Sequence, residues 1–548
     1  MKRDHLALLW TALLVSTAVP GLSQSKVPIW TRFEAVFESQ QSHENPVQQV
    51  ELQVNFVSPS GKKQTVLGFW DGAKTWRVRF SPDEIGVWSY STSSSDPSDK
   101  GLQDKSGKFE CVPYTGERAL YEHGAIRLSP DRHYLVHADG APFFWLACTG
   151  WNAALLSTDE EWKTYLNDRR NKRFTAIQFV ATAPWRAAPT DRDGNVAFTG
   201  KEAIAIQPAF FQRMDRKFDL LNETGLVGLP VLLWAIRADK DPGLALPENQ
   251  AALLVRYLVA RYGAHHVIWI LGGDANYSGE RAKRWYGIGR EGLKFNPGRL
   301  TTLHPQGMQW PWDDFRDQAW LDILVYQSGH GNSDASRKWN CVGPPATKWR
   351  DEPHRPVINA EPNYEGHLSY EERKPFQDYH VRRAAYWSLL ASPTAGLTYG
   401  AHGIWSWEEK PAVPLDHPRT GEARPWKEAI GFPGSMQMKL MRDLFERLPW
   451  WELRPADEIV LDRPDDPTFL HYIKAAKTTS GEWAVVYLPD NEGVTIDVKP
   501  FGGEIEGVWF DPRTGKFSKT IEVPKDATQL HFKVPGHGDW VLILHKKR

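Results

Sequence analysis

Short segments of alternating polar and apolar residues fill the first region of the chain, from about residue 27 to 112. Glu51–Val57 and Trp76–Phe80 alternate in this way, as strands with one buried face do. Ser58–Gly61 has the composition of a turn, and the polar stretch Ser91–Lys100 has that of a loop. Several short strands at this spacing predict a small antiparallel β-sandwich.

The middle of the chain, from about residue 116 to 445, alternates apolar strand-like runs with longer helical segments. The apolar runs are Phe143–Cys148, Thr175–Val180, Leu226–Ala235, Val267–Leu271, Leu300–Leu303, Ile323–Gln327, Val357–Ala360 and Gly396–Tyr399. Helical patterns follow at Glu160–Arg170, Pro208–Thr224, Asn249–Tyr262 and Pro375–Ala391. Strands that are apolar throughout, joined by helices, predict parallel pairing with both faces covered, and eight such units suit a (β/α)8 TIM barrel. An open doubly wound sheet is the alternative, but no Gly-rich phosphate turn follows an early strand.

From about Trp450 onward the pattern is that of a β domain again. Glu482–Leu488, Gly507–Phe510 and Trp540–Leu544 have the pattern of strands, and Asp511–Gly515 has that of a turn. This predicts a second β-sandwich, with no sequence repeat that links it to the first. The predicted domains are a signal peptide at 1–23, a β-sandwich at 24–116, a (β/α)8 barrel at 117–447 and a β-sandwich at 448–548.

The N-terminus has the parts of an export signal. Lys2 and Arg3 supply the positive end, Leu6–Val19 is an apolar stretch, and small residues offer a cleavage site before Gln24. A membrane anchor is the alternative, but the apolar run is short for a span. No second long apolar segment follows it. We therefore expect a soluble, secreted or periplasmic protein with no membrane span in its mature form.

Composition narrows the range of partners. The 548-residue chain has a formal net charge of −1 and no long run of like charges, so neither nucleic acid nor an anionic membrane is an expected partner. The chain contains 26 Trp and only 6 Met, and tryptophan either fills cores or offers flat surfaces on which sugar rings stack. The 3 cysteines fit neither a disulfide framework nor a zinc site. The oligomeric state stays open.

Two of the apolar runs end at an acidic residue. Val267–Leu271 leads into Asp274, and Val357–Ala360 leads into Glu361. Active sites of α/β barrels lie at the carboxyl-terminal ends of the strands, and two carboxylates across a pocket are needed to cleave a glycosidic bond. Asp274 could instead cap the next helix, and Glu361 could pair with an arginine near the rim. Their equivalent positions after the fourth and seventh runs favour a shared catalytic role.

Polar and aromatic residues follow the other predicted strands. Amide, imidazole, indole and phenol groups on one face of a barrel suit the hydroxyl groups and C–H faces of a sugar. The predicted substrate-binding residues are Trp151, Asn152, Gln178, Trp234, Asn276, Gln327, His330, Asn363, Tyr399 and Trp405. Similar positions are held by Trp185, Tyr277, Asn359, Tyr364, His402 and Trp407, whereas Trp269 is expected in the barrel core.

The sequence predicts no metal site and no cofactor. Asp191–Asn195 hints at a calcium loop but lacks the later Glu of that pattern, so a plain turn is favoured. His265 and His266 begin a strand, at the wrong face of the barrel for catalysis, and are expected to be structural. No serine nucleophile elbow, phosphate-binding loop or His-Glu-x-x-His motif occurs.

Three stretches of the middle region resemble the apiosidase-like glycoside hydrolases: Phe144–Trp151, Trp269–Asp274 and Asn359–Glu365. The resemblance implies the barrel of a large retaining clan, with Asp274 as acid/base after strand four and Glu361 as nucleophile after strand seven. Most of the clan has Asn-Glu at the acid/base position, so the Asp here departs from the clan while keeping the pattern of the family. The resemblance covers most of the mature chain but does not name the sugar.

The flanking regions also resemble known modules. The first resembles a small β module often fused ahead of such barrels, and the last, through Val508–Gly515, resembles a β module named for collagen binding. We expect a glycoside hydrolase that acts on side chains of plant or microbial polysaccharides, with an oligo- or polysaccharide as its partner. The alternatives are a barrel that binds carbohydrate without catalysis and a scaffold that docks extracellular matrix through its end sandwiches.

Overall fold

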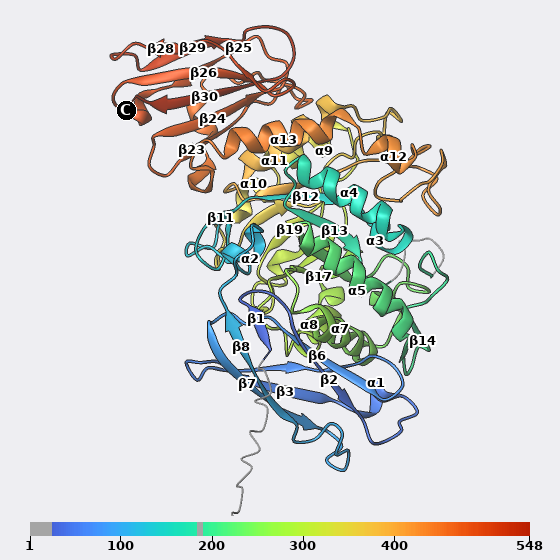
Figure 1. Cartoon of the computed structure of the whole chain (residues 1–548). Coiled ribbons are helices and arrows are strands. Elements are labelled where there is room, and N and C mark those ends of the chain that lie inside the picture. The colour runs from blue at the N-terminus through green and yellow to red at the C-terminus, as the bar shows by residue number, and fades with distance from the viewer. Residues whose placement is uncertain (1–24, 183–189, 548) are drawn as a thin grey trace, which may run out of the picture.

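A central barrel between two β-sandwiches makes up the computed structural model, which describes residues 25–182 and 190–547 (Figure 1). The predicted signal peptide and Trp185 lie outside the described residues. Within the described part of the chain, every helix is too short or too polar to cross a membrane.

The N-terminal region forms the predicted sandwich. One sheet has the order β1 (Lys26–Pro28), β8 (Ser106–Val112), β7 (Gly86–Ser94), β3 (Leu52–Val57), β4 (Lys63–Leu67), and the other β2 (Phe33–Glu38), β6 (Thr75–Phe80), β5 (Phe69–Trp70). Along β3 every second residue is buried, as the alternating pattern predicts. The rings of Phe56 and Phe80 stack across the two sheets at 4.1 Å, and those of Phe33 and Phe109 at 4.2 Å. These aromatic pairs make the core of the sandwich.

Eight parallel strands form the barrel, and each overlaps one of the predicted apolar runs. In chain order they are β12 (Trp145–Thr149), β13 (Ala176–Val180), β16 (Val227–Trp234), β17 (Trp269–Ala275), β18 (Thr301–Pro305), β19 (Leu324–Tyr326), β20 (Val357–Asn359) and β21 (Gly396–Gly400). The first strand, β12, pairs with the last, β21, which an open doubly wound sheet does not do. Between β18 and β19, the backbone N–H groups of Asp322 and Ile323 donate to the Thr301 carbonyl oxygen. The prediction of a barrel is therefore confirmed.

Helices surround the barrel where the sequence predicts the main ones. They are α3 (Ala153–Leu156), α4 (Asp159–Asn171), α5 (Pro208–Glu223), α6 (Pro242–Ala245), α7 (Glu248–Tyr262), α8 (Glu280–Gly292), α9 (Asp334–Val342), α10 (Pro344–Thr347), α11 (Asp378–Ala391), α12 (Trp426–Ala429) and α13 (Pro433–Phe445). The start of α4 is fixed by a capping box, in which Thr158 and Glu161 bond to each other's backbone N–H. Pro208 begins α5 at a position where its missing N–H costs no hydrogen bond.

Smaller elements join these parts. Between the first sandwich and the barrel lie α2 (Ala119–His123) and a sheet of β9 (Arg127–Leu128), β10 (Leu135–Val136) and β11 (Pro142–Phe143). The short helix α1 (Pro46–Gln49) lies within the sandwich region. The hairpin of β14 (Phe198–Thr199) and β15 (Ala205–Ile206) lies within the barrel region. The stretch from Asp191 to Asn195 is a turn, because one carboxylate oxygen of Asp191 accepts the backbone N–H groups of Asp193 and Asn195. Cys111, Cys148 and Cys341 are buried and unbridged.

The C-terminal region forms the second predicted sandwich. One sheet contains β22 (Leu453–Pro455), β23 (Lys474–Thr478), β24 (Trp483–Leu488), β30 (Trp540–Lys546), β26 (Ile505–Asp511), β27 (Lys516–Phe517) and β28 (Ile521–Val523), and the other β25 (Gly493–Asp497) and β29 (Gln529–Lys533). It is fastened to α11, where Arg382 donates two hydrogen bonds to the buried carboxylate of Asp539. Tyr386 of α11 stacks on Tyr487 of β24 at 4.7 Å.

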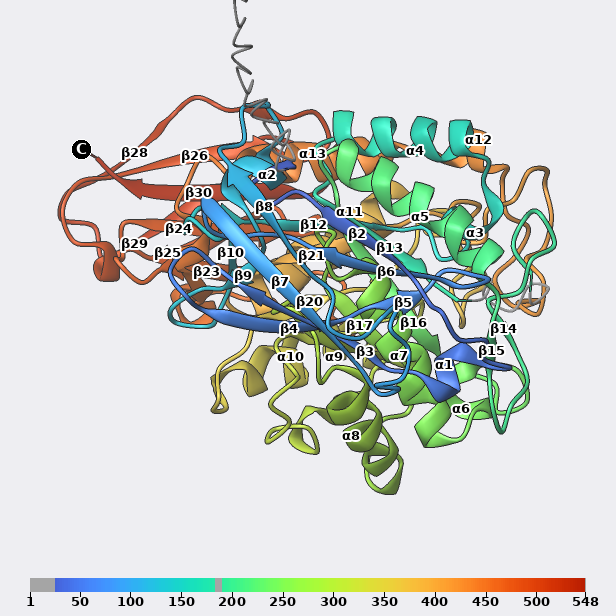
Figure 2. The same ribbon diagram turned by 60° about the horizontal axis from the view of Figure 1, so that its bottom comes forward.

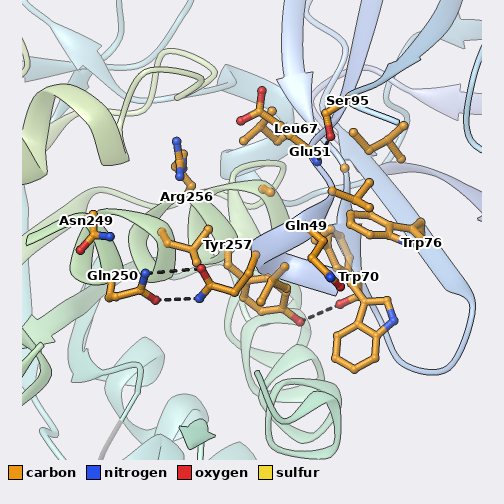
Figure 3. Close-up of a pocket in the computed structure, with 18 residues that line it drawn as sticks. Gln49, Glu51, Leu67, Trp70, Trp76, Ser95, Asn249, Gln250, Arg256 and Tyr257 are labelled. Atoms are coloured by element: carbon orange, nitrogen blue, oxygen red, sulfur yellow. Dashed lines mark hydrogen bonds between the residues drawn. The ribbon is translucent and has the colours of Figure 1, made fainter. Parts of the chain in front are cut away.

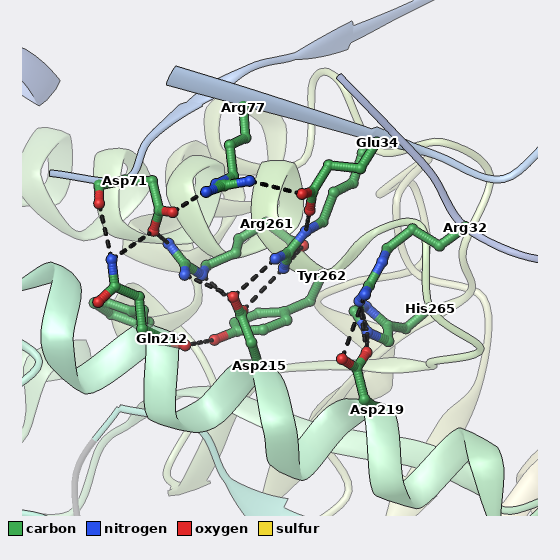
Figure 4. A network of polar contacts seen from close by, with 12 residues as sticks. Arg32, Glu34, Asp71, Arg77, Gln212, Asp215, Asp219, Arg261, Tyr262 and His265 are labelled. Carbon is green, nitrogen blue, oxygen red and sulfur yellow. Dashed lines mark hydrogen bonds and ion pairs between the residues drawn. The ribbon is translucent and has the colours of Figure 1, made fainter. Parts of the chain in front are cut away.

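A network of ion pairs joins the first sandwich to the barrel (Figure 4). Asp215 of α5 accepts two hydrogen bonds from Arg79 of β6, at 2.9 and 2.7 Å, and two from Arg261 of α7, at 2.8 and 2.7 Å. His265 bonds to Asp219 of α5 at 2.9 Å. The sequence predicts a structural role for the histidine pair before β17, and this contact of His265 agrees with that role.

A second contact between the sandwich and the barrel surrounds a cavity of about 310 Å³ along α7 (Figure 3). The side chains of Gln48 and Gln250 bond to each other, and the Tyr257 hydroxyl donates to the Trp70 carbonyl oxygen at 3.0 Å. Figure 2, in which the sandwich comes forward, shows its strands over the same side of the barrel as α7. The sandwich is thus part of one continuous body with the barrel.

Candidate active site

Asp274 and Glu361 lie at the carboxyl-terminal ends of β17 and β20, which β18 and β19 separate in the barrel, and both line one cavity of about 350 Å³. Asp274 is the second-last residue of β17, and Glu361 follows the end of β20 by two residues. The N-cap of α8 is Gly279, so the alternative in which Asp274 caps that helix is wrong. Glu361 bonds to two histidines rather than to an arginine at the rim.

The backbone at Asp274 is irregular. Its φ is +46°, in the left-handed region that a residue other than glycine seldom adopts, and the pairing of β17 with β18 shifts register between Gly273 and Ala275. Irregularities of this kind turn a side chain out of the regular alternation of a strand and concentrate next to active sites. They aim Asp274 at the cavity instead of leaving it in the sheet.

Glu361 is 3% exposed and is held by two imidazole groups. His304 Nε2 lies 3.0 Å from Oε2, and His330 Nε2 lies 3.0 Å from Oε1. Burial alone would raise the pKa of Glu361, but hydrogen bonds from His304 and His330 outweigh it and lower the pKa below its usual value. The carboxylate is therefore ionised in the folded protein.

Tyr364 links the two acids electrostatically. Burial raises the pKa of its phenol well above the usual value, and the negative charges of Glu361 and of Asp274 add to that shift. Both carboxylates therefore act on the same phenol group, which also lines the cavity.

Loops after β19, β20 and β21 supply most of the cavity wall. Beside the two acids, the wall consists of Gln327, His330, Tyr364, His367, Tyr370, Trp405, Asp416, His417, Pro418, Arg419 and Thr420. The indole of Trp405 packs edge-on against the His417 ring at 5.2 Å. The Oε1 atom of Gln327 is buried and has no hydrogen-bond partner among the described residues. Because the Gln327 side chain lines the cavity, its amide group is a candidate contact for a sugar hydroxyl.

Five of the predicted catalytic and substrate-binding residues line this cavity: Asp274, Glu361, Gln327, His330 and Trp405. Tyr364, which the sequence places at a similar position, also lines it. Three others lie deeper in the barrel. Trp151 and Trp234 meet edge to face at 5.2 Å, and Trp151 makes a similar contact with His304. Gln178 donates to the Ala360 carbonyl oxygen at 3.3 Å. They support the residues around Glu361 and are not part of the cavity lining.

The three predicted asparagines also lie outside the cavity lining, because each holds a loop. Asn276 accepts the backbone N–H of Ser278, and the Asn363 amide donates to the Gly329 carbonyl oxygen at 2.8 Å. The Asn152 amide donates to a carbonyl oxygen in the loop after β21. Short polar side chains at strand ends often bond to nearby backbone in this way.

Tyr399 is also outside the cavity lining. Its side chain is fully buried, its hydroxyl donates to Glu365 at 2.6 Å, and the Arg169 guanidinium of α4 lies 5.9 Å from its ring. These contacts place the Tyr399 ring between β21 and the surrounding helices, away from the cavity lining. Trp269, expected in the core, is fully buried.

The sequence analysis missed His304, which bonds to Glu361, and several residues that line the cavity. His304 directly follows the fifth apolar run, so the rule that found Asp274 and Glu361 applies to it as well. His367, Tyr370 and the stretch 416–420 lie in long loops, where no periodic pattern marks the residues that turn inward. Among the described residues, no three His, Cys, Asp or Glu side chains are grouped to hold a metal ion.

Comparison with protein families supports this description. Residues 129–452 match the model described as "Apiosidase-like, catalytic domain". Residues 26–95 match a domain of unknown function, DUF5060, and residues 455–545 match a model named for a collagen-binding domain of a collagenase. No curated protein matches the chain.

Solved structures share the fold. One described as a glycoside hydrolase is 23% identical, with a TM-score of 0.69 over 78% of this chain and 98% of that one. A glycoside hydrolase of family 5 from Bacteroides vulgatus is 24% identical, with a TM-score of 0.68 over 78% and 94% of the two chains. A further Bacteroides vulgatus structure covers 96% of this chain and 100% of its own, with a TM-score of 0.70 at 19% identity.

The catalytic-domain model spans more than half of the chain, so the protein belongs to the apiosidase-like family. It is a glycoside hydrolase, and its substrate is a carbohydrate. This sets aside the two alternatives in which the barrel has no catalytic activity.

Proposed function

We propose that the protein is an exported, retaining glycoside hydrolase in which Glu361 is the nucleophile and Asp274 the acid/base. Its substrates are glycosidic bonds in side chains of plant or microbial polysaccharides. The observation that carries the proposal is the single cavity lined by both carboxylates. Two carboxyl groups on either side of one sugar are what this reaction requires.

The reaction proceeds in two steps. Asp274 donates its proton to the glycosidic oxygen while Glu361 attacks the anomeric carbon, which forms a glycosyl-enzyme and releases the leaving sugar as an alcohol. Asp274 then takes a proton from water, the water oxygen attacks the anomeric carbon, and Glu361 leaves as a carboxylate. The hydrogen bonds from His304 and His330 keep Glu361 ionised, as a nucleophile must be.

A substrate screen and two substitutions test these roles. The purified protein is incubated with a panel of plant and bacterial glycans, and proton NMR records the anomer that forms first. We expect retention of configuration on the released sugar. The two variants are then assayed on the substrate that the screen identifies. Asp274→Asn should lower kcat by about 10²–10⁴-fold, which is the usual contribution of general acid–base catalysis. Glu361→Gln should lower kcat by at least as much. An inverted product would instead require the carboxyl groups to lie roughly 6.5–9.5 Å apart with a water between them.

Leaving-group dependence separates the two acids. A substrate with an acidic phenol as leaving group needs little protonation, so Asp274→Asn should retain most of its first-step rate on it, whereas Glu361→Gln should not. Glu371→Gln is a matched control, because Glu371 is an exposed carboxylate near the cavity that does not line it. If Glu371→Gln lost as much activity as the other two variants, the assignment would fail.

Export is the second part of the proposal. The basic start and the apolar stretch of the first 23 residues support it. When the full chain is produced in a Gram-negative host, N-terminal sequencing of the protein from the periplasm or the medium should begin at or near Gln24. Recovery of the uncleaved chain from the cytoplasm alone would contradict this assignment.

A further inference from the structure

A second cavity, of about 520 Å³, lies between the first sandwich and the barrel. Its barrel residues include Gly263–Ala264 and Asn296–Arg299, which precede β17 and β18, whereas Asp274 and Glu361 lie at or beyond the far ends of their strands. The remaining wall comes from the sandwich and from β9. This cavity is therefore at the opposite end of the barrel from the proposed active site.

Arg299 is the most unusual group in this cavity. The residue is only 7% exposed, and its Nε donates to the Gly263 carbonyl oxygen at 2.9 Å. That bond satisfies a carbonyl group at the end of α7, but the described residues provide no acceptor for the two Nη groups. A buried guanidinium without a bonded carboxylate is unfavourable unless an anion can reach it.

The other charged groups of the wall leave an excess of positive charge. Arg127 lies over the Trp30 ring at 5.8 Å and has no ion pair among the described residues, and Lys62 is 3.8 Å from Asp83. Lys62, Arg127 and Arg299 thus face a single carboxylate. Burial lowers the pKa of Arg299 to about 10; Asp83 opposes this shift and the positive charge of Arg127 adds to it.

The remaining polar groups fit the same chemistry. The hydroxyl oxygen of Ser81 is buried and has no hydrogen-bond partner among the described residues. Arg79 also lines the cavity, but its guanidinium is already bonded to Asp215 and Glu34. Among the charged groups of the wall, the guanidinium groups of Arg127 and Arg299 are therefore the ones without a bonded carboxylate among the described residues.

We propose that this cavity is a binding site for an oxyanion, that is, a carboxylate, sulfate or phosphate group. Guanidinium groups bind such groups through paired, charge-assisted N–H···O bonds, and the planar fork of arginine matches their geometry. The carboxylate of an acidic sugar and a free inorganic ion share this chemistry. Binding neutralises the charge of Arg299 and bridges the sandwich to the barrel.

Isothermal titration calorimetry on the full chain tests the site. Sodium phosphate, sodium sulfate and sodium glucuronate are titrated separately at constant ionic strength set with sodium chloride. We expect one anion per chain, and the relative affinities show whether an inorganic ion or a sugar carboxylate is preferred. Arg299→Gln and Arg127→Gln should each weaken binding at least about fivefold, since each removes a charge-assisted donor.

Asp83→Asn should have the opposite effect on affinity. It removes the one carboxylate that competes with the anion, so it should tighten anion binding. Arg127→Gln and Asp83→Asn change side chains that are not buried, so they keep the test valid even if Arg299→Gln does not fold. Arg290→Gln is the matched control, since Arg290 is exposed and pairs with Glu291. Absence of binding to all three anions, or equal binding by Arg127→Gln and wild type, would overturn the proposal.

Discussion

The Nε2 atom of His304 lies 3.0 Å from Oε2 of Glu361, and the other carboxylate oxygen receives a matching bond from His330. The two imidazole groups come from different parts of the barrel, at the end of β18 and after β19. Each oxygen of the proposed nucleophile is thereby fixed in position. A carboxylate held in this way stays ionised and keeps one orientation, which favours attack along a single direction.

Removing either imidazole should move the acidic limb of the pH–rate profile to higher pH. The two hydrogen bonds stabilise the ionised form of Glu361, so losing one raises the pKa of that carboxyl and protonates it at a less acidic pH. A hydrogen bond to a charged group contributes about 1.5–3 kcal/mol, so kcat/KM should fall about 13- to 160-fold in His304→Ala and in His330→Ala. The measurement is kcat/KM against pH for the wild type and both variants.

His402→Gln controls for the loss of a buried imidazole. His402 is 1% exposed and bonds to the Gly421 carbonyl oxygen and to Trp405, with no bond to Glu361. This variant should be less stable than the wild type, but its acidic limb should keep its position. Identical profiles for all the histidine variants would show that His304 and His330 only support the fold.

Gln327→Leu should weaken substrate binding without destabilising the protein. The side chain is 7% exposed, and its Oε1 has no hydrogen-bond partner among the described residues, so leucine of similar size removes an unfilled polar group. If a sugar hydroxyl bonds to this oxygen, its net contribution of about 0.5–1.5 kcal/mol corresponds to a rise in KM of about 2- to 12-fold. Steady-state kinetics and the melting temperature are measured together. A lower melting temperature with an unchanged KM would show that Gln327 is structural.

The strands could be predicted because their burial is uniform. Every residue of the eight barrel strands except Asp274 is buried, so the sequence shows each strand as an apolar run, and acidic residues at the ends of two runs stand out. His304 directly follows a third such run and could have been found by the same rule. The pattern thus locates strand ends well, and with them the proposed catalytic pair.

Residues that follow a strand end could not be sorted by pattern alone. Asn276 and Asn363 have the composition of sugar contacts, yet they bond to backbone groups of their own loops. Tyr370 and Arg419 come from loops whose path depends on tertiary packing, and they line the cavity without any local signal. An amide or aromatic residue after a strand has the same sequence signature whether it turns inward or holds a loop.

Breaking the ion pairs of Asp215 should loosen the first sandwich from the barrel. Asp215→Ala leaves Arg79 and Arg261 without their shared carboxylate, and removing one partner of a buried ion pair costs about 3–5 kcal/mol. Calorimetry should show a lower melting temperature, and limited proteolysis should cut the connection between sandwich and barrel faster. Glu280→Gln is the control, because Glu280 pairs with Lys283 on an exposed helix surface, where the effect is within about 0.5 kcal/mol.

Acid should weaken the same interface through Asp215. Burial alone would raise the pKa of Asp215, but hydrogen bonds from Arg79 and Arg261 lower it to about 2, below the usual value of 3.8. Because the folded pKa is the lower one, the stabilisation is present in full above about pH 4 and is lost as the pH falls toward the folded value. Between pH 5 and 3 the melting temperature of the wild type should therefore fall more steeply than that of Asp215→Asn, which has no carboxylate to protonate. Parallel slopes of melting temperature against pH for the two proteins would mean that other carboxylates govern the acid response. The control variant Glu280→Gln should follow the wild type.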